Sequence, residues 1–303
     1  YIAGRLSQLG ITLLGLSVAL FWLLHLIPGD PARLYAGPEA TKEEISQVRQ
    51  RLGLDDPIHV QYLRYAGGIV RGDWGTSIRT GRPVMSEILG RYPATLNLAF
   101  FSLLVTVSFG IPAGVISATD PGSRWDHWTM TLAVLAASVP VFWSGLMLIL
   151  FFAVKFPLFP SGGSEGTIFF VLPSLALGFN SAAVLARLTR SAMTDVMRED
   201  YIRTARAKGL RERKVIYRHA FRNALLPLVT VLGMEAGTLL SGAVLTETVF
   251  SINGLGRYIV QSIGFRDYPV IMGAVLLLAL NFALINLFVD VLYCLIDPRI
   301  RFA

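Results

Sequence analysis

The stretch that decides the fold is residues 190–222, which reads RSAMTDVMREDYIRTARAKGLRERKVIYRHAFR. It is basic, contains no long apolar run, and lies between two long apolar segments of a chain that is otherwise mostly hydrophobic. In membrane proteins, Lys and Arg near the ends of spanning helices are retained on the cytosolic side. We therefore expect residues 190–223 to form a cytosolic loop.

Composition places the chain in a membrane. Of its 303 residues, 53% are hydrophobic and 16% are charged, whereas soluble domains carry about 25% charged residues. The net charge of +7 is explained by cytosolic loops, so we expect a lipid bilayer and no nucleic acid as a partner. The single cysteine, Cys294, excludes an internal disulfide and is expected to pack as a small hydrophobe.

The apolar segments predict an all-α integral membrane protein with six transmembrane helices. About 20 apolar residues are needed to cross roughly 30 Å of hydrocarbon. The segments that meet this are 8–27, 93–118, 128–154, 168–188, 224–246 and 270–296. We expect the first to be a retained helix and not a cleaved leader. Pro112 and Pro140 lie inside spans, where we expect them to kink the helix.

An extracytosolic subdomain is expected at residues 28–92. Pro28-Gly29-Asp30-Pro31 ends the first span, and Thr41 with Glu44 forms a capping box before a periodic apolar face that reaches Gly53. A second helical rhythm covers 57–70 and is broken at 72–75 by Gly-Asp-Trp-Gly. Acidic and basic residues nearly cancel here, which favours a folded subdomain over a tether.

Six spans place both termini on the same side of the membrane. Arg5, Arg124, residues 190–222, Arg299 and Arg301 all fall on that side, so we expect it to be the cytosol.

Several kinds of chemistry are missing from the sequence. No Gly-Lys dipeptide occurs, so the sequence contains no phosphate-binding P-loop motif. The four histidines, at 25, 59, 127 and 219, lack zinc-ligand spacing. We expect no catalytic, metal or cofactor site, and a chain that transports, anchors or assembles.

Polar residues inside the spans are candidates for a translocation path. They are Asn180, Glu235, Thr238, Ser241 and Asn281. A charged group in a span is costly unless it faces water or a partner, so Glu235 either pairs across the bundle, is kept protonated, or lines the path. Asp290 is expected to pair with an arginine near the cytosolic boundary. Gly233, Gly237 and Ser241 form a small-residue stripe that serves either packing within the chain or a subunit interface or pore.

Within the basic loop the sequence predicts two short helices separated by a turn. Residues 200–208 are strong helix formers, Gly209 is a helix C-terminus signal, and a helical pattern restarts at 211–221. Such an element can present a small-residue surface to a partner.

This loop resembles the EAA-type cytoplasmic loop of ABC importer permeases, in the form used by the dipeptide/oligopeptide/nickel subfamily. The resemblance rests on 200–209, on His-Ala-Phe-Arg-Asn-Ala at 219–224, and on Pro227. Further motifs typical of the first permease subunit follow in order: Pro-Gly-Asp-Pro at 28–31, Gly-Asp-Trp-Gly at 72–75, Pro-Ala-Thr-Leu at 93–96, Pro-Ser-Gly-Gly at 160–163, Glu-Thr-Val-Phe at 247–250, Gly-Leu-Gly-Arg at 254–257 and Arg-Asp-Tyr-Pro-Val at 266–270. Two departures are Arg203-Thr204-Ala205 in place of Glu-Ala-Ala, and Asn253 in place of Pro.

The resemblance implies that residues 1–303 form one transmembrane domain of a bacterial inner-membrane importer. Its partners would be a second homologous permease, two ATP-binding subunits that hold ATP and Mg²⁺, and an extracytosolic substrate-binding protein that docks on 28–92. The ATPase-coupling residues would be Asp200, Arg203, Thr204, Ala205, Arg206, Ala207, Lys208 and Gly209.

For the cargo, the resemblance implies di- or oligopeptides, with glutathione and nickel chelates as alternatives. An ion-coupled secondary transporter that uses Glu235 or Asp290 is a different class, as is a scaffold that transports nothing.

Overall fold

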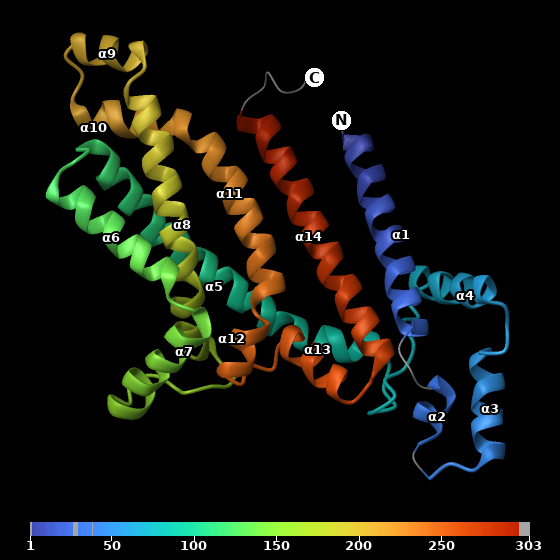
Figure 1. Cartoon of the computed structure of the whole chain (residues 1–303). Helices are drawn as coiled ribbons and strands as arrows, with labels where there is room; N and C mark the ends of the chain where they lie inside the picture. Colours follow the sequence, from blue (N-terminus) through green and yellow to red (C-terminus); the bar gives the residue numbers. More distant parts are fainter. Residues whose placement is uncertain (1, 27–29, 38, 297–303) are drawn as a thin grey trace. The chain divides into compact units, whose positions relative to one another are not determined.

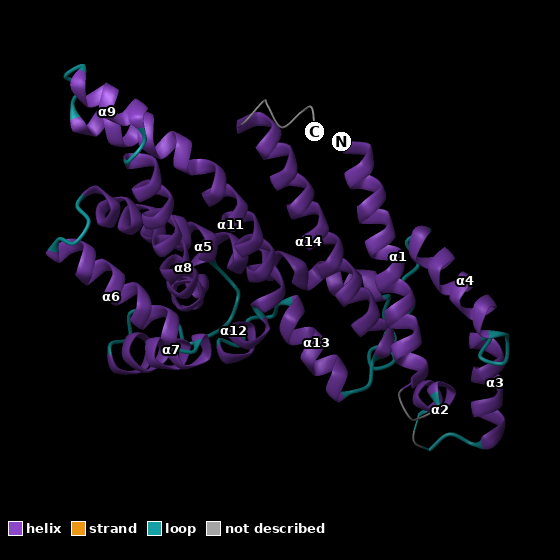
Figure 2. Cartoon of the chain, turned by 45° about the horizontal axis from the view of Figure 1, so that its top comes forward, coloured by secondary structure: helices purple, strands orange, loops and turns teal. Residues whose placement is uncertain are grey.

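The computed structural model describes residues 2–26, 30–37 and 39–296. The described chain is helical, and its only strand-like pairing is an isolated bridge between Thr76 and Pro83. Figures 1 and 2 show helices joined by loops. The longer helices are α1 (Ile2–Leu26), α3 (Lys42–Leu52), α4 (Ile58–Val70), α5 (Val84–Thr119), α6 (Arg124–Ser138), α7 (Val141–Ile149), α8 (Val171–Met197), α9 (Asp200–Ala207), α11 (Phe221–Gly242), α13 (Leu255–Gly264) and α14 (Tyr268–Ile296).

Short elements complete the chain, and its contacts group into two compact units. The short elements are α2 (Pro31–Ala36), η1 (Leu150–Lys155), η2 (Thr167–Phe170), α10 (Glu212–Lys214), η3 (Val215–Ala220) and α12 (Val244–Val249). The first unit consists of residues 1–93 and 257–283, and the second of 94–256 and 284–303.

In the first unit, aromatic packing joins α1 to α4. The ring of Phe21 on α1 lies 5.4 Å from that of Tyr62 and 5.9 Å from that of Tyr65. A hydrogen bond of 2.9 Å joins the hydroxyls of Ser17 and Tyr62. The α4 helix therefore packs against one side of α1 through its tyrosine side chains.

The predicted capping box of α3 is confirmed. The Thr41 hydroxyl accepts the Glu44 backbone N–H at 3.3 Å, and the Glu44 carboxylate accepts the Thr41 N–H at 2.7 Å. These backbone and side-chain hydrogen bonds hold the pKa of Glu44 below its usual value. Gly53 ends the helix at φ +65, as a left-handed cap requires.

In the second unit, α5 packs closely on α8 through glycines. A Cβ on Gly114 would lie 2.4 Å from the Cβ of Thr189, and one on Gly178 would lie 2.6 Å from the Cβ of Val105. Real Cβ atoms do not approach this closely, so the contact requires glycine on both helices. The α8 helix also packs against α6, α7 and α11, and so forms the centre of this unit.

The number of spans is confirmed only in part. Among the residues that the structure describes, four helical segments are long and apolar enough to cross a membrane, namely Val84–Thr119, Thr167–Met197, Glu212–Leu240 and Tyr268–Leu292. A fifth is the bent pair Arg124–Ser138 and Val141–Lys155, if both helices belong to one span. The apolar part of α1 is Ser7–Leu23, which is shorter than the roughly 20 residues that a span requires. Six transmembrane helices therefore stay a prediction.

The expected kink at Pro140 is instead a break. We predicted one continuous span over 128–154, but α6 ends at Ser138 and α7 begins at Val141, with 96° between the two helices. Proline has no N–H to donate and disfavours helical conformation in the residue before it. Val139 is extended accordingly, at φ −85 and ψ 126.

Other predicted boundaries also differ from those in the structure. The α5 helix begins at Val84, so residues 84–92, which we assigned to the extracytosolic subdomain, are continuous with the second predicted span. The fifth predicted span divides into α11 and α12. Pro28, Gly29, Arg299 and Arg301, which carried the first-span stop and part of the charge count, lie outside the described residues.

Candidate functional site

The predicted helix within the basic loop is present as α9. Figure 1 shows it beyond the C-terminal end of α8. Ile202 is 0% exposed and Ala205 is buried, and both join an apolar cluster with Val115 of α5, Met193 of α8 and Val215 of η3. Three elements of the same chain therefore hold α9 by one face.

The turn at Gly209 is a Schellman motif. The N–H of Gly209 donates to the carbonyl of Arg206 at 2.9 Å, and the N–H of Leu210 donates to that of Ala205 at 3.4 Å. Gly209 has φ +72, and a Cβ placed on it would meet no atom within 4 Å. Glycine is needed here for its backbone conformation and not for space.

Most of the predicted coupling residues lie on the free face of α9. The exposed ones are Asp200, Arg203, Thr204, Arg206, Ala207, Lys208 and Gly209. The Asp200 side chain is 96% exposed, and Arg203 approaches it at 3.4 Å. Ala205 differs from the expectation, because its side chain faces the chain's own core. It helps to seat α9, and Ala207 is the small residue that remains on the outer face.

A partly buried ion pair joins α8 to the first turn of α6. Arg190 donates from Nε to Oδ1 of Asp126 at 2.7 Å and from Nη2 to Oδ2 at 2.8 Å. The same carboxylate accepts the Gly122 N–H at 2.8 Å and the Ser117 hydroxyl. Asp126 is 3% exposed. The sequence analysis missed this pair, although Ser123 three residues before Asp126 is a helix-start signal that marks the aspartate.

The candidate path residues are distributed over both units. The Asn180 amide donates to the carbonyl of Ala136 at 3.4 Å, and the Thr238 hydroxyl donates to that of Met234 at 2.9 Å. Asn281 belongs to the other unit, where it accepts the Tyr92 hydroxyl. The side chain of Ser241 lies outside what the structure describes.

Glu235 and the glycine stripe near it have different environments. Glu235 is half-buried, and no residue in the described ranges forms a hydrogen bond or ion pair with its carboxylate. A Cβ on Gly233 would lie 2.2 Å from Cγ2 of Val289. Gly233 therefore serves close packing of α11 on α14 within this chain, which is the first of the two roles that the stripe suggested.

Several motifs that are distant in the sequence pair in the second unit. Glu247 of α12 is 0% exposed and accepts the Thr95 hydroxyl at 2.6 Å. The Thr95 oxygen accepts the Leu255 N–H at 2.8 Å. A Cβ on Gly254 would lie 2.3 Å from the Glu247 carboxyl carbon. The motifs at 93–96, 247–250 and 254–257 thus build one buried polar centre.

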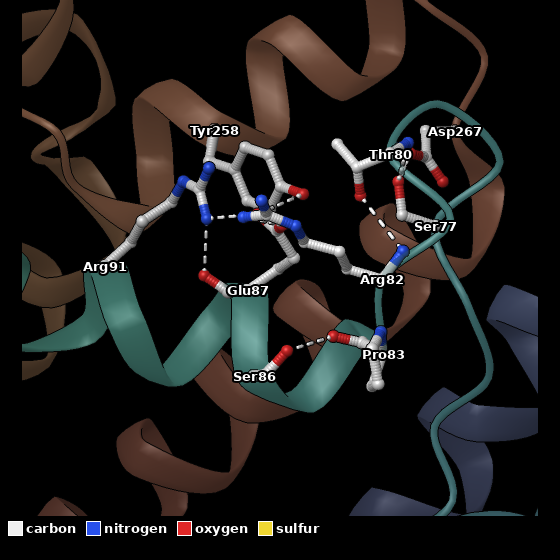
Figure 3. Close-up of polar contacts among 9 residues, drawn as sticks. All are labelled: Ser77, Thr80, Arg82, Pro83, Ser86, Glu87, Arg91, Tyr258 and Asp267. Carbon is white, nitrogen blue, oxygen red and sulfur yellow. Dashed lines mark hydrogen bonds and ion pairs between the residues drawn. The ribbon is translucent and has the colours of Figure 1, made fainter.

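The first unit contains a second polar centre, shown in Figure 3. Glu87 at the start of α5 is buried, accepts Arg91 at 2.5 Å and accepts the Tyr258 hydroxyl at 3.3 Å. The Arg91 guanidinium lies 3.8 Å from the centre of the Tyr258 ring. Burial, with the charge of Glu87 beside it, raises the pKa of Tyr258 to about 12. Tyr258 therefore remains a hydrogen-bond donor at any physiological pH.

The motif at 266–270 closes the loop that follows Gly-Asp-Trp-Gly. Asp267 is buried and accepts the Ser77 hydroxyl at 2.5 Å, the Ile78 N–H at 3.1 Å and the Arg79 N–H at 3.3 Å. The Arg79 guanidinium lies 3.6 Å from the centre of the Phe265 ring. Sequence reasoning singled out both motifs but assigned no contact between them.

The chain matches two family models that together cover most of its length. The model described as binding-protein-dependent transport system inner membrane component matches residues 110–302. The model for the N-terminal part of such membrane components matches residues 1–99.

Curated relatives match over the full length. The chain is 48% identical over 303 residues to a glutathione transport system permease protein GsiC of Salmonella paratyphi A, covering 100% of this chain and 99% of the relative. It is 47% identical over the same length to GsiC of Escherichia coli K12, again covering 100% and 99%.

Solved structures share the fold. An inward-facing MetNI methionine ABC transporter chain superposes with a TM-score of 0.60 at 21% identity, covering 70% of this chain and 97% of that one. A chain of an amino acid ABC transporter gives 0.54 at 19% identity, covering 68% and 94%. Because these relatives are ABC importer permeases, the alternative prediction of an ion-coupled secondary transporter is wrong. The chain belongs to the family of binding-protein-dependent transport system inner membrane components, and is a bacterial inner-membrane permease subunit of an ABC importer of the dipeptide/oligopeptide/nickel subfamily, which works with ATP-binding subunits and a substrate-binding protein.

Proposed function

We propose that this permease subunit imports glutathione. The observation that carries the proposal is the 48% identity, without truncation of either chain, to a permease named for glutathione transport. Glutathione is itself a small peptide, so the proposal narrows the peptide cargo that the sequence motifs implied. Di- and oligopeptides and nickel chelates are the competing cargoes.

The proposed assembly contains a second homologous permease, two ATP-binding subunits and an extracytosolic binding protein. The two permeases together enclose the path, to which this chain contributes Asn180, Glu235, Thr238, Ser241 and Asn281. Glu235 supports this role, because it is half-buried and has no polar partner among the described residues. A carboxylate in a span requires water or a partner, and a wet path supplies water.

We assign the outer face of α9 to docking on an ATP-binding subunit. Its inner face is anchored by Ile202 and Ala205, and the chain direction after it is set by Gly209. Because α9 packs on α5, α8 and η3, a movement of the ATP-binding subunit that displaces α9 would be transmitted to all three elements. The assignment places 190–223 and both termini in the cytosol, and 28–92 on the opposite side, where it receives the binding protein.

Uptake by the complete complex tests the cargo. The permease would be reconstituted in proteoliposomes with its partner permease, its ATP-binding subunits and its binding protein. We expect ATP-dependent accumulation of labelled glutathione that excess unlabelled dipeptide does not suppress. Accumulation of a labelled dipeptide or nickel chelate without glutathione uptake would assign the cargo to the competing class.

A further inference from the structure

A cationic cavity lies on α10 and η3, directly after the α9 turn. It has a volume of about 380 Å³ and is lined by Arg211, Arg213, Lys214, Tyr217 and Arg218. Figure 1 shows α10 next to α9, before the chain enters α11. None of these five residues belongs to the outer face of α9 that we assigned to the ATPase.

No ion pair among the described residues neutralises the four cations of this cavity. Within the described ranges, no carboxylate lies at ion-pair distance from Arg211, Arg213, Lys214 or Arg218. The acidic residue of the segment, Glu212, is already held by Arg206, with Nε and Oε1 2.9 Å apart. Like charges that line one cavity repel one another, so the cavity favours an anion.

Local backbone structure keeps the cationic side chains outward. Val215 and Ala220 of η3 are fully buried, whereas the four cations and Tyr217 are exposed. The η3 segment is a π-helix, Val215–Ala220, a form that is uncommon and occurs frequently at functional sites. The buried residues fix the turn, and the cations remain free to meet a ligand.

The position of the cavity indicates which anion it meets. The candidate span Glu212–Leu240 begins at the cavity, and its apolar part follows the cationic residues. We therefore place the cavity at the membrane surface, next to the end of this span. Tyr217 is 58% exposed, and tyrosine is enriched at that interface. Clusters of Lys and Arg beside the cytosolic end of a span bind the headgroups of anionic lipids.

We propose that Arg211, Arg213, Lys214 and Arg218 form a binding site for the phosphate headgroup of an anionic phospholipid of the inner leaflet. The site rests on the cytosolic placement of 190–223 in the proposed function and does not depend on the cargo. A bound lipid neutralises the cluster and ties the segment between α9 and α11 to the membrane surface.

Native mass spectrometry of the complete complex, purified in detergent and titrated with phosphatidylglycerol or phosphatidylcholine, tests the site. The variant is R213Q/R218Q, and the matched control is R198Q/R222Q, which removes the same charge from exposed residues of the same loop outside the cavity. We expect phosphatidylglycerol to bind the wild-type complex in preference to phosphatidylcholine. The double variant should bind it roughly 30-fold more weakly, the factor that two surface cations supply, and the control should lose less.

Other outcomes would overturn the proposal. Equal loss of phosphatidylglycerol in both double variants would show non-specific charge attraction. Displacement of the lipid by millimolar inorganic phosphate would assign the cavity to a soluble anion. Dissociation of the ATP-binding subunits from R213Q/R218Q, with lipid binding unchanged, would assign it to the ATPase dock. The variant R213K/R218K keeps the positive charge and should retain most of the bound lipid. Glutathione uptake, measured on the same complexes, tests the proposed cargo independently of the lipid site.

Discussion

Arg190 holds Asp126 by two hydrogen bonds, although 64 residues separate them in the chain. The pair joins the first turn of α6 to the part of α8 that leads into α9. Because Asp126 also accepts from Ser117 and Gly122, one carboxylate fixes α5, the α5–α6 turn and α8 together. The ion pair therefore stabilises the part of α5 and α8 against which α9 packs.

Asp126→Asn should destabilise the second unit. The change leaves the Arg190 guanidinium partly buried without its counter-ion. We expect a loss of about 2 kcal/mol, less than for a fully buried pair because the Arg190 side chain is 36% exposed. Thermal unfolding of the complex in detergent measures this. Asp120→Asn, at an exposed position in the same turn, should have no effect, and equal stability of the two variants would contradict the assignment.

Gly209 variants should separate backbone strain from size. Gly209→Ala places a Cβ in open space but at φ +72, which costs about 1 kcal/mol. We expect transport and substrate-stimulated ATP hydrolysis to fall together, further in Gly209→Val and least in Gly209→Asn, since asparagine tolerates this conformation. Reconstituted vesicles give both rates. Normal coupling in Gly209→Val would remove the turn from the mechanism.

Ile202 should control coupling from inside the chain. Ile202→Ala opens a cavity in the cluster under α9 and should cost about 2–5 kcal/mol, whereas Ile202→Val should cost about 1 kcal/mol. We expect ATP hydrolysis to lose its dependence on substrate in the same order, because the seat of α9 loosens. Hydrogen exchange of residues 200–210 reports the loosening. Unaltered exchange in Ile202→Ala would contradict the anchoring role.

Asp267→Asn should loosen the loop at 76–83. The amide cannot accept from Ser77, Ile78 and Arg79 as the carboxylate does, and unsatisfied buried donors cost about 2 kcal/mol. Trypsin should then cleave after Arg79 faster than in the wild type. Asp73→Asn is the matched control, because Asp73 is exposed and accepts only locally, from the Gly75 N–H at 3.1 Å. Equal cleavage rates in the two variants would refute the role of Asp267.

Local signals predicted local structure well. The capping box of Thr41 and Glu44 and the turn at Gly209 were readable because their partners lie within five residues. The inward direction of Ala205 was not, since a small residue on a short helix suits either face. The Asp126–Arg190 pair and the Glu247 centre depend on contacts across 64 and 152 residues. The hydrophobic periodicity of a segment carries no information about contacts over such distances in the chain. The position of the break at Pro140 was predictable, because proline acts locally, but its 96° angle was not.

The contact between Thr95 and Glu247 limits which segments of related permeases can be combined in a chimera. Thr95 lies within the N-terminal family model, 1–99, but its hydrogen bonds go to residues matched by the second model, 110–302. The α5 helix runs without interruption through the junction of the two models. The two regions that families recognise are therefore not separable parts. A chimera joined near residue 100 inherits half of a buried hydrogen-bond network from each parent, and it folds only where both parents supply matching halves.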